Sequence, residues 1–169
     1  MTEDRLKIVV FGSFNAGKST FIHTLDPEAR HTEVDIMGGT TTVALDFGRI
    51  FIGGRHVYLF GTPGQERFEF ARDIISRGID GAVVLVDTTA DLDEFTLHLC
   101  RGLHDAGIPR VIALNKCDCD TACPERIQAC FESDEETLCI SALSREDAYR
   151  TIEHLVGHIH TCHANHPSH

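Results

Sequence analysis

The sequence has no tryptophan and only two tyrosines, and no apolar run approaches the ~20 residues that a membrane helix needs. Basic residues are also scarce, since 15 Lys and Arg against 26 Asp and Glu give a formal net charge of −11. Such a chain repels nucleic-acid phosphates unless it carries a strong basic patch, and none is visible. The ends show no signal peptide, myristoylation site or prenylation box. We therefore expect no nucleic-acid partner, no membrane anchor and a cytoplasmic location.

Cysteine and histidine raise the question of metal binding. The seven cysteines are an odd number, and without a signal sequence they are expected to be reduced thiols. Cys117, Cys119 and Cys123 lie close together but lack the paired C-x-x-C spacing of structural zinc. Near the carboxyl end, His154 and His158 share a helix face at i and i+4. Metal binding by these histidines and a solvated, frayed tail both stay open.

One motif dominates the amino-terminal part of the chain. Residues 12–19 read GSFNAGKS, the pattern G-x-x-x-x-G-K-S, directly after the apolar run 8–11. The glycines let backbone N–H groups converge on a phosphate, Lys18 supplies a positive charge, and Ser19 offers a hydroxyl to Mg²⁺ at the start of a helix. The sequence therefore predicts a nucleoside triphosphate site made of Gly12, Asn15, Ala16, Gly17, Lys18, Ser19 and Thr20.

A second motif concerns the base. The apolar run 111–114 ends in Asn115-Lys116-Cys117-Asp118, the pattern N-K-x-D. The Asp118 carboxylate can accept hydrogen bonds from N1–H and the exocyclic amino group of guanine, a pair of donors that adenine lacks. A later loop, Ser141-Ala142, could bring the backbone of Ala142 against the base. These segments favour GTP and GDP as the bound nucleotides. The alternative, an ATP-dependent kinase with the same phosphate loop, would make the N-K-x-D segment a coincidence.

Apolar runs alternate with helical patterns along most of the chain. Strands are expected over 7–11, 43–52, 56–60, 81–86, 110–114 and 137–140, and helices over 18–25, 70–76, 92–106, 124–131 and 145–160. Gly53-Gly54 indicates a hairpin turn. The pattern predicts an α/β fold with a six-stranded, mostly parallel sheet, one antiparallel strand, and helices on both faces. Residues 1–161 would form this domain, and 162–169 a His-rich C-terminal tail.

Together these motifs resemble the Ras-like small GTPases over nearly the whole chain. Residues 40–47 and 62–68 look like the two switches of that superfamily. The segments TTVALDFGRI, LFGTPGQERF and SRGIDGAVVLVD are most similar to a prokaryotic branch, the MglA-like and conservon-type proteins. The resemblance implies the P-loop GTPase fold, a switch that slowly hydrolyses GTP, bound Mg²⁺, and a regulatory protein of the activating, exchange or roadblock-domain type.

The same resemblance implies roles for particular residues. Ser19 and Thr42 would hold Mg²⁺, although Thr40 and Thr41 stay open as alternatives to Thr42. Gly64 would contact the nucleotide. Gln65 and Lys18 would act in hydrolysis, the first by orienting the attacking water and the second by offsetting phosphate charge.

Two departures from that superfamily favour a different function. Gly61 stands where the relatives carry an aspartate that serves Mg²⁺, and Phe14 occupies a place that is commonly small. Both favour a GTP-binding regulatory or scaffold module that is deficient in hydrolysis, whereas Gln65 favours an active GTPase.

Two further residues carry hypotheses of their own. Asp87 ends the apolar run 82–86 beside the phosphate loop and could replace the acid missing at Gly61; alternatively, it only caps the turn at Thr88-Thr89. Asn15 matches a residue that helps another GTPase branch bind a monovalent cation, or it is simply a turn former.

Overall fold

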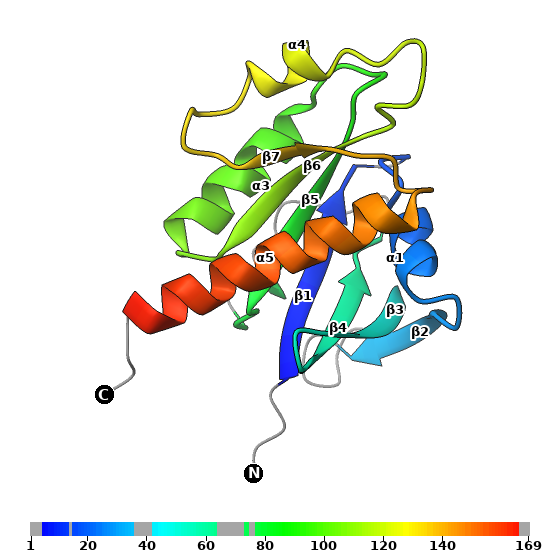
Figure 1. Cartoon of the computed structure of the whole chain (residues 1–169), viewed down its shortest axis with the longest axis vertical. Coiled ribbons are helices and arrows are strands. Elements are labelled where there is room, and N and C mark those ends of the chain that lie inside the picture. Colours follow the sequence, from blue (N-terminus) through cyan, green and yellow to red (C-terminus); the bar gives the residue numbers. More distant parts are fainter. Residues whose placement is uncertain (1–4, 14, 36–41, 64–72, 75–76, 166–169) are drawn as a thin grey trace.

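A single seven-stranded sheet organises the chain, in the order β2-β3-β4-β1-β5-β6-β7 (Figure 1). The computed structural model describes residues 5–13, 15–35, 42–63, 73–74 and 77–165, with the backbone alone for 32–35 and 42–44. Its strands are β1 (Arg5–Gly12), β2 (Arg30–Asp35), β3 (Thr42–Ile52), β4 (Arg55–Gly61), β5 (Gly81–Asp87), β6 (Arg110–Asn115) and β7 (Thr137–Cys139). The described helices are α1 (Lys18–Leu25), α3 (Glu94–Asp105), α4 (Pro124–Gln128) and α5 (Arg145–Asn165).

Strand direction confirms the expected fold class. β3 alone runs antiparallel to its neighbours β2 and β4, while the pairs β1–β4, β1–β5, β5–β6 and β6–β7 are parallel. The expected number of six strands is wrong, because β2 adds a seventh at the edge of the sheet. Its sequence, RHTEVD, contains one aliphatic residue and so lacks the apolar run that marks a buried strand.

Both faces of the sheet are covered by helices. In β1, Ile8 and Val10 pack into the core under α1 and α5, whereas Val9 and Phe11 pack into a second core with residues of α3 and α4. This alternation follows from the two-residue period of a strand. Figure 1 shows α5 lying across one face of the sheet with α1 beside it and α3 on the other side. Burial on both faces explains the continuous apolar runs at the centre of the sheet.

The expected hairpin at Gly53-Gly54 is confirmed. The two glycines join β3 to β4 with φ of 57° and 78°, and the flanking residues Ile52 and Arg55 pair with each other. A two-residue hairpin of this kind needs positive φ at both central positions, which glycine adopts without strain. The hairpin fixes the register of β3 against β4, and this register matters for the site described below.

The described helices lie where the sequence predicted them, but their lengths agree less well with the prediction. α1 has the expected bounds, whereas α5 continues to Asn165, so residues 162–165 of the expected tail are helical. Of the helix expected over 70–76, the structure describes Asp73 and Ile74, which are helical. Among the described helices, none combines the length and apolar character needed to cross a membrane.

Candidate functional site

A cleft of about 570 Å³ opens at the edge of the sheet where the parallel strands end. The cleft is lined by the loop after β1 and the start of α1, by residues at the ends of β4, β5 and β6, and by one residue each from β2 and β3. Crevices at the carboxyl ends of parallel strands are where α/β sheets bind ligands. Among the side chains that line this cleft are Lys18, Ser19, Asp46, Asp87 and Lys116.

Lys18 lies almost fully buried at the base of the cleft, with 8% of its surface exposed. Its ammonium donates hydrogen bonds to the carbonyl of Gly12 and, over 3.3 Å, to that of Pro63. The first turn of α1 contains no acidic residue. The exposed side chains of Ser19 and Thr20 stand at the same helix end, so a positive charge, hydroxyls and the helix N-terminus converge where an anion binds favourably.

Asn115 connects three loops of the site. Its side chain is buried; Nδ2 donates to the carbonyl of Ala16 over 2.8 Å, and Oδ1 accepts from the N–H groups of Lys116 at 2.7 Å and Ala142 at 2.8 Å. One amide therefore holds the phosphate loop, the N-K-x-D segment and the Ser141-Ala142 loop together. Gly17 has φ of 99°, and a Cβ placed there would overlap the amide nitrogen of Asn115. Only glycine fits this approach.

Asp118 and the loop after β7 lie on the same side as the cleft loops. The Asp118 side chain is exposed, and within the described part of the chain it accepts no hydrogen bond from another residue. Ala142 is buried, and the N–H of Ser141 donates to the Asp147 carboxylate over 2.9 Å, which fixes the loop to the start of α5. The Asp118 carboxylate could therefore accept hydrogen bonds from a ligand.

Asp87 is held by its neighbours in the way that the capping hypothesis expects. Its Oδ1 accepts from the N–H and the hydroxyl of Thr89 at 2.9 and 2.6 Å, and its Oδ2 accepts from the Lys116 ammonium at 2.8 Å. Burial raises the pKa of Asp87, but the hydrogen bonds from Lys116 and Thr89 outweigh it and leave this pKa below its ordinary value. The structure thus favours Asp87 as a residue that orders the loop and Lys116.

A different acid occupies the place beside Ser19. Asp46 of β3 lies opposite Gly61 of β4 in the sheet register, and its Oδ2 accepts the hydrogen bond of the Ser19 hydroxyl. Its Oδ1 lies 3.1 Å from Nδ1 of His31, and 13% of its side chain is exposed. A Cβ at Gly61 would stand 2.8 Å from Ile22 Cδ1 and 3.3 Å from Asp46 Cβ. The carboxylate therefore comes from the neighbouring strand, into space that a residue at 61 would otherwise enter.

Sequence reasoning missed Asp46. The signal was present, because Asp46 is an acid inside the apolar pattern Val43-Ala44-Leu45-Asp46-Phe47. The role of Asp46 depends on which residue of β4 lies opposite it, and the hairpin sets this register.

Several of the expected site residues lie outside what the structure describes. Phe14, Thr40, Thr41, Gly64 and Gln65 are not among the described residues. Thr42 is the first residue of β3, paired with Asp35, and its side chain is likewise not described. Their roles stay predictions.

Asn15 and the cysteines have simpler explanations than metal binding. Asn15 has φ of 68°, a left-handed conformation that asparagine tolerates better than most residues. All the cysteines are free, as expected. Burial and the neighbouring Cys139 raise the pKa of the Cys117 thiol to about 11. In the described residues, no metal-binding group includes Cys117, Cys119 or Cys123.

Comparison with known proteins agrees with this geometry. A family model described as 50S ribosome-binding GTPase matches residues 7–116. The chain is 35% identical over 118 residues to the uncharacterized protein MJ1339 of Methanocaldococcus jannaschii, over 70% of this chain and 74% of that protein. It is 30% identical over 127 residues to GTPase Der of Dechloromonas aromatica, over 68% of this chain but 28% of Der.

Solved structures share the fold at lower identity. The G domain of the FeoB iron transporter of T. maritima aligns with a TM-score of 0.69 at 19% identity, over 91% of this chain and 98% of that domain. Translation elongation factor SelB from Methanococcus maripaludis, in complex with the GTP analogue GppNHp, aligns with a TM-score of 0.67 at 18% identity, over 95% of this chain and 35% of SelB. At these identities, the likeness is evidence for the fold.

Proposed function

The chain belongs to the GTPase family described as 50S ribosome-binding GTPase, and from this membership we propose that it is a guanine-nucleotide switch that slowly hydrolyses GTP to GDP and phosphate. One observation carries the proposal. The buried side chain of Asn115 joins the phosphate loop, the N-K-x-D segment and the Ser141-Ala142 loop into one site. We infer that triphosphate and guanine would be recognised by segments that this one side chain holds together.

The proposed site residues would serve either the phosphates or the base. Lys18 and the N–H groups of the loop 12–17 would offset charge on the β- and γ-phosphates, which is the largest contribution a protein makes to phosphoryl transfer. Asp118 would accept two hydrogen bonds from guanine, and Ala142 would approach the base through its backbone. Gln65 would orient the attacking water. After hydrolysis the two switch segments would be released, and this change of conformation would report which nucleotide is bound.

The donor set beside Ser19 fits Mg²⁺. The Ser19 hydroxyl and the Asp46 carboxylate meet at the foot of the cleft, and oxygen ligands of this kind are those that Mg²⁺ prefers. We propose that Ser19, Asp46 and Thr42 hold the ion, with Asp46 in place of the acid missing at Gly61. When bound, the ion would supply charge stabilisation to the β- and γ-phosphates. The presence of Asp46 weakens the argument that Gly61 makes the chain deficient in hydrolysis.

Control by another protein completes the proposal. The resemblance of the switch segments to the MglA-like and conservon-type branch supports a partner of the activating, exchange or roadblock-domain type, and a signalling role in the cytoplasm. The similarity to GTPase Der, at 30% identity, supports hydrolysis as the activity.

Exchange of Asp118 for Asn tests guanine recognition. The amide cannot accept both guanine donors, so we expect GTP affinity to fall roughly 5- to 150-fold, corresponding to about 1–3 kcal/mol for donors left unpaired. Affinity for xanthosine triphosphate should rise. Competition titration against a fluorescent GTP analogue measures both. The control Asp120→Asn makes the same change at an exposed residue two positions away. Equal affinity of the unmodified chain for ATP and GTP contradicts the assignment.

Exchange of Gln65 for Leu separates the switch from the hydrolysis-deficient module. Without an activating partner, we expect single-turnover hydrolysis on the order of 10⁻⁴ to 10⁻³ s⁻¹, the range of unassisted Ras. Gln65→Leu should lower this rate and leave GTP affinity unchanged, whereas the exposed control Gln128→Leu should change neither. If the unmodified chain shows no detectable hydrolysis, or if Gln65→Leu does not change the rate, the result would favour the hydrolysis-deficient GTP-binding module.

A further inference from the structure

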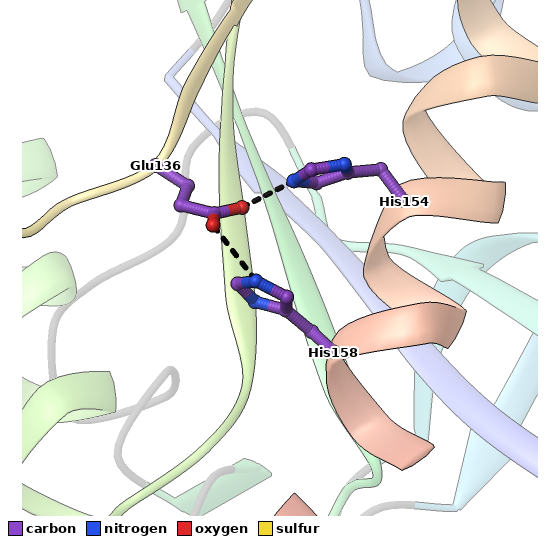
Figure 2. A group of neighbouring side chains, drawn as sticks. All are labelled: Glu136, His154 and His158. Carbon is purple, nitrogen blue, oxygen red and sulfur yellow. Dashed lines mark hydrogen bonds and ion pairs between the residues drawn. The ribbon is translucent and has the colours of Figure 1, made fainter. Parts of the chain in front are cut away.

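Two histidines and a glutamate meet far from the loops of the nucleotide cleft (Figure 2). Glu136 directly precedes β7, and its carbonyl accepts from the N–H of Ile112 over 2.9 Å. His154 and His158 project from α5, one turn apart. Because β7 is parallel to β6, Glu136 lies at the amino-terminal edge of the sheet, whereas the cleft lies at the carboxyl edge. This group is therefore separate from the proposed Mg²⁺ ligands.

The geometry of the three side chains is convergent. Nε2 of His154 contacts Oε2 of Glu136, and Nε2 of His158 lies 2.8 Å from Oε1 of the same carboxylate. One ligand atom from each residue lies within 4.8 Å of the others, and the two rings have centroids 5.2 Å apart. Figure 2 shows both imidazoles pointing at the carboxylate from the same side of α5. Each side chain is about 40% exposed, so an ion could enter from solvent.

This set of atoms has the chemistry of a transition-metal site. Two imidazole nitrogens and a carboxylate form the His₂Glu ligand set of zinc enzymes, which leaves a fourth tetrahedral position for water. Mg²⁺ and Ca²⁺ prefer oxygen ligands, so a site with two imidazole nitrogens is unfavourable for either ion. We propose that Glu136, His154 and His158 bind one Zn²⁺, which joins the carboxyl-terminal half of α5 to the segment that leads into β7.

Proton balance and ionisation agree with the proposal. In the contacts to Glu136, each histidine donates its Nε2–H to one carboxylate oxygen. Zn²⁺ takes Nε2 without its proton, so binding to a neutral ring would shift the single ring proton from Nε2 to Nδ1. Burial raises the pKa of Glu136, but the hydrogen bond with His154 and the charges of both histidines outweigh it, so this pKa lies below its ordinary value. Glu136 is thus a carboxylate at neutral pH.

The rest of the helix shows why these residues differ from a histidine-rich tail. His160 contacts Arg55 and His163 is exposed on the last turn of α5. Within the described residues, neither joins a group of three ligands. The proposed site instead draws on two elements, since Glu136 is 18 residues before His154. A Zn²⁺ ion that bridges these two elements would stabilise β7 at the edge of the sheet.

Zinc titration of the full chain without an affinity tag tests the site. With excess Mg²⁺ and GDP present and a chromophoric chelator as competitor, we expect one Zn²⁺ per chain. His158→Ala and Glu136→Gln should each lower the affinity more than about tenfold, since loss of even an outer-shell partner costs 10- to 100-fold. The matched control His163→Ala should keep the affinity. Zinc should also raise the thermal midpoint of the unmodified chain and of His163→Ala, but not that of His158→Ala.

Each alternative has its own outcome. If His163→Ala weakens binding as much as His158→Ala does, the zinc is held adventitiously by the tail and the proposal is wrong. Retention of affinity by Glu136→Gln shows a histidine pair without the carboxylate and overturns it as well. Circular dichroism of the zinc-free variants checks that they fold, which we expect because the side chains of Glu136 and His158 are each about 40% exposed. GTP affinity is measured on the same samples, so failure of the zinc site and failure of the proposed GTPase are distinguishable.

Discussion

Replacing Asn115 with Ala is expected to lower the free energy of unfolding by roughly 2–6 kcal/mol and to weaken GTP binding. The substitution removes the side-chain amide that bonds two buried backbone groups, the carbonyl of Ala16 and the N–H of Ala142, besides the half-buried N–H of Lys116. Each of these buried backbone groups then lacks a hydrogen bond, at about 1–3 kcal/mol per group. Because the bonds come from three loops, the phosphate and base sites should loosen together. Urea denaturation and a fluorescent GTP analogue measure the two effects.

The matched control for Asn115 is Asn165→Ala, the same chemical change at the exposed end of α5. Surface changes of this kind stay within about 0.5 kcal/mol. If Asn115→Ala changes the free energy of unfolding by less than 1 kcal/mol and leaves GTP affinity intact, the buried amide does not hold the site together. The proposal that one residue couples phosphate and base recognition would then lose its support.

The parts of the fold that followed from sequence are those governed by local rules. Buried strands such as β1 and β5 show continuous apolar runs because both faces of the sheet are covered. Gly53-Gly54 marks a hairpin because only glycine adopts positive φ freely. β2 was missed because an edge strand buries little and needs no apolar pattern. Its pairing with β3 depends on contacts that the six residues themselves do not encode.

The candidate site shows the same division. The phosphate loop and N-K-x-D are contiguous motifs, so their residues could be named from sequence and the structure brings them into one place. Asp46 and Asp87 could not be told apart in that way. Asp87 follows an apolar run beside the phosphate loop, which is the usual local pattern for a Mg²⁺-side acid, yet Lys116 and Thr89 engage both of its oxygens. Asp46 reaches Ser19 only because the hairpin sets it opposite Gly61.

Removing the Asp46 side chain is expected to raise the Mg²⁺ concentration needed to retain nucleotide. Asp46→Gly takes away the carboxylate that contacts Ser19, and we expect the Mg²⁺ midpoint of nucleotide release to rise about tenfold or more, as losses around a metal site do. Asp87→Ala is the control, because it removes the carboxylate that orders Lys116 and should leave this midpoint unchanged. Nucleotide affinity measured in chelator should not respond to Asp46→Gly, which separates an effect on the ion from an effect on folding.

A double variant that moves the acid from position 46 on β3 to position 61 on β4 tests the same role of the carboxylate more sharply. A Cβ at Gly61 would stand 3.3 Å from Asp46 Cβ, so Asp46→Gly clears the space that Gly61→Asp needs, and only the flexible end of Ile22, 2.8 Å away, must shift. We expect the double variant Asp46→Gly/Gly61→Asp to bring the Mg²⁺ midpoint back toward that of the unmodified chain, whereas Gly61→Asp alone should crowd Asp46 and destabilise the domain. If the double variant folds by circular dichroism but stays as impaired as Asp46→Gly, the two positions are not interchangeable. If instead Asp87→Ala raises the midpoint and Asp46→Gly does not, the carboxylate that serves the ion is Asp87.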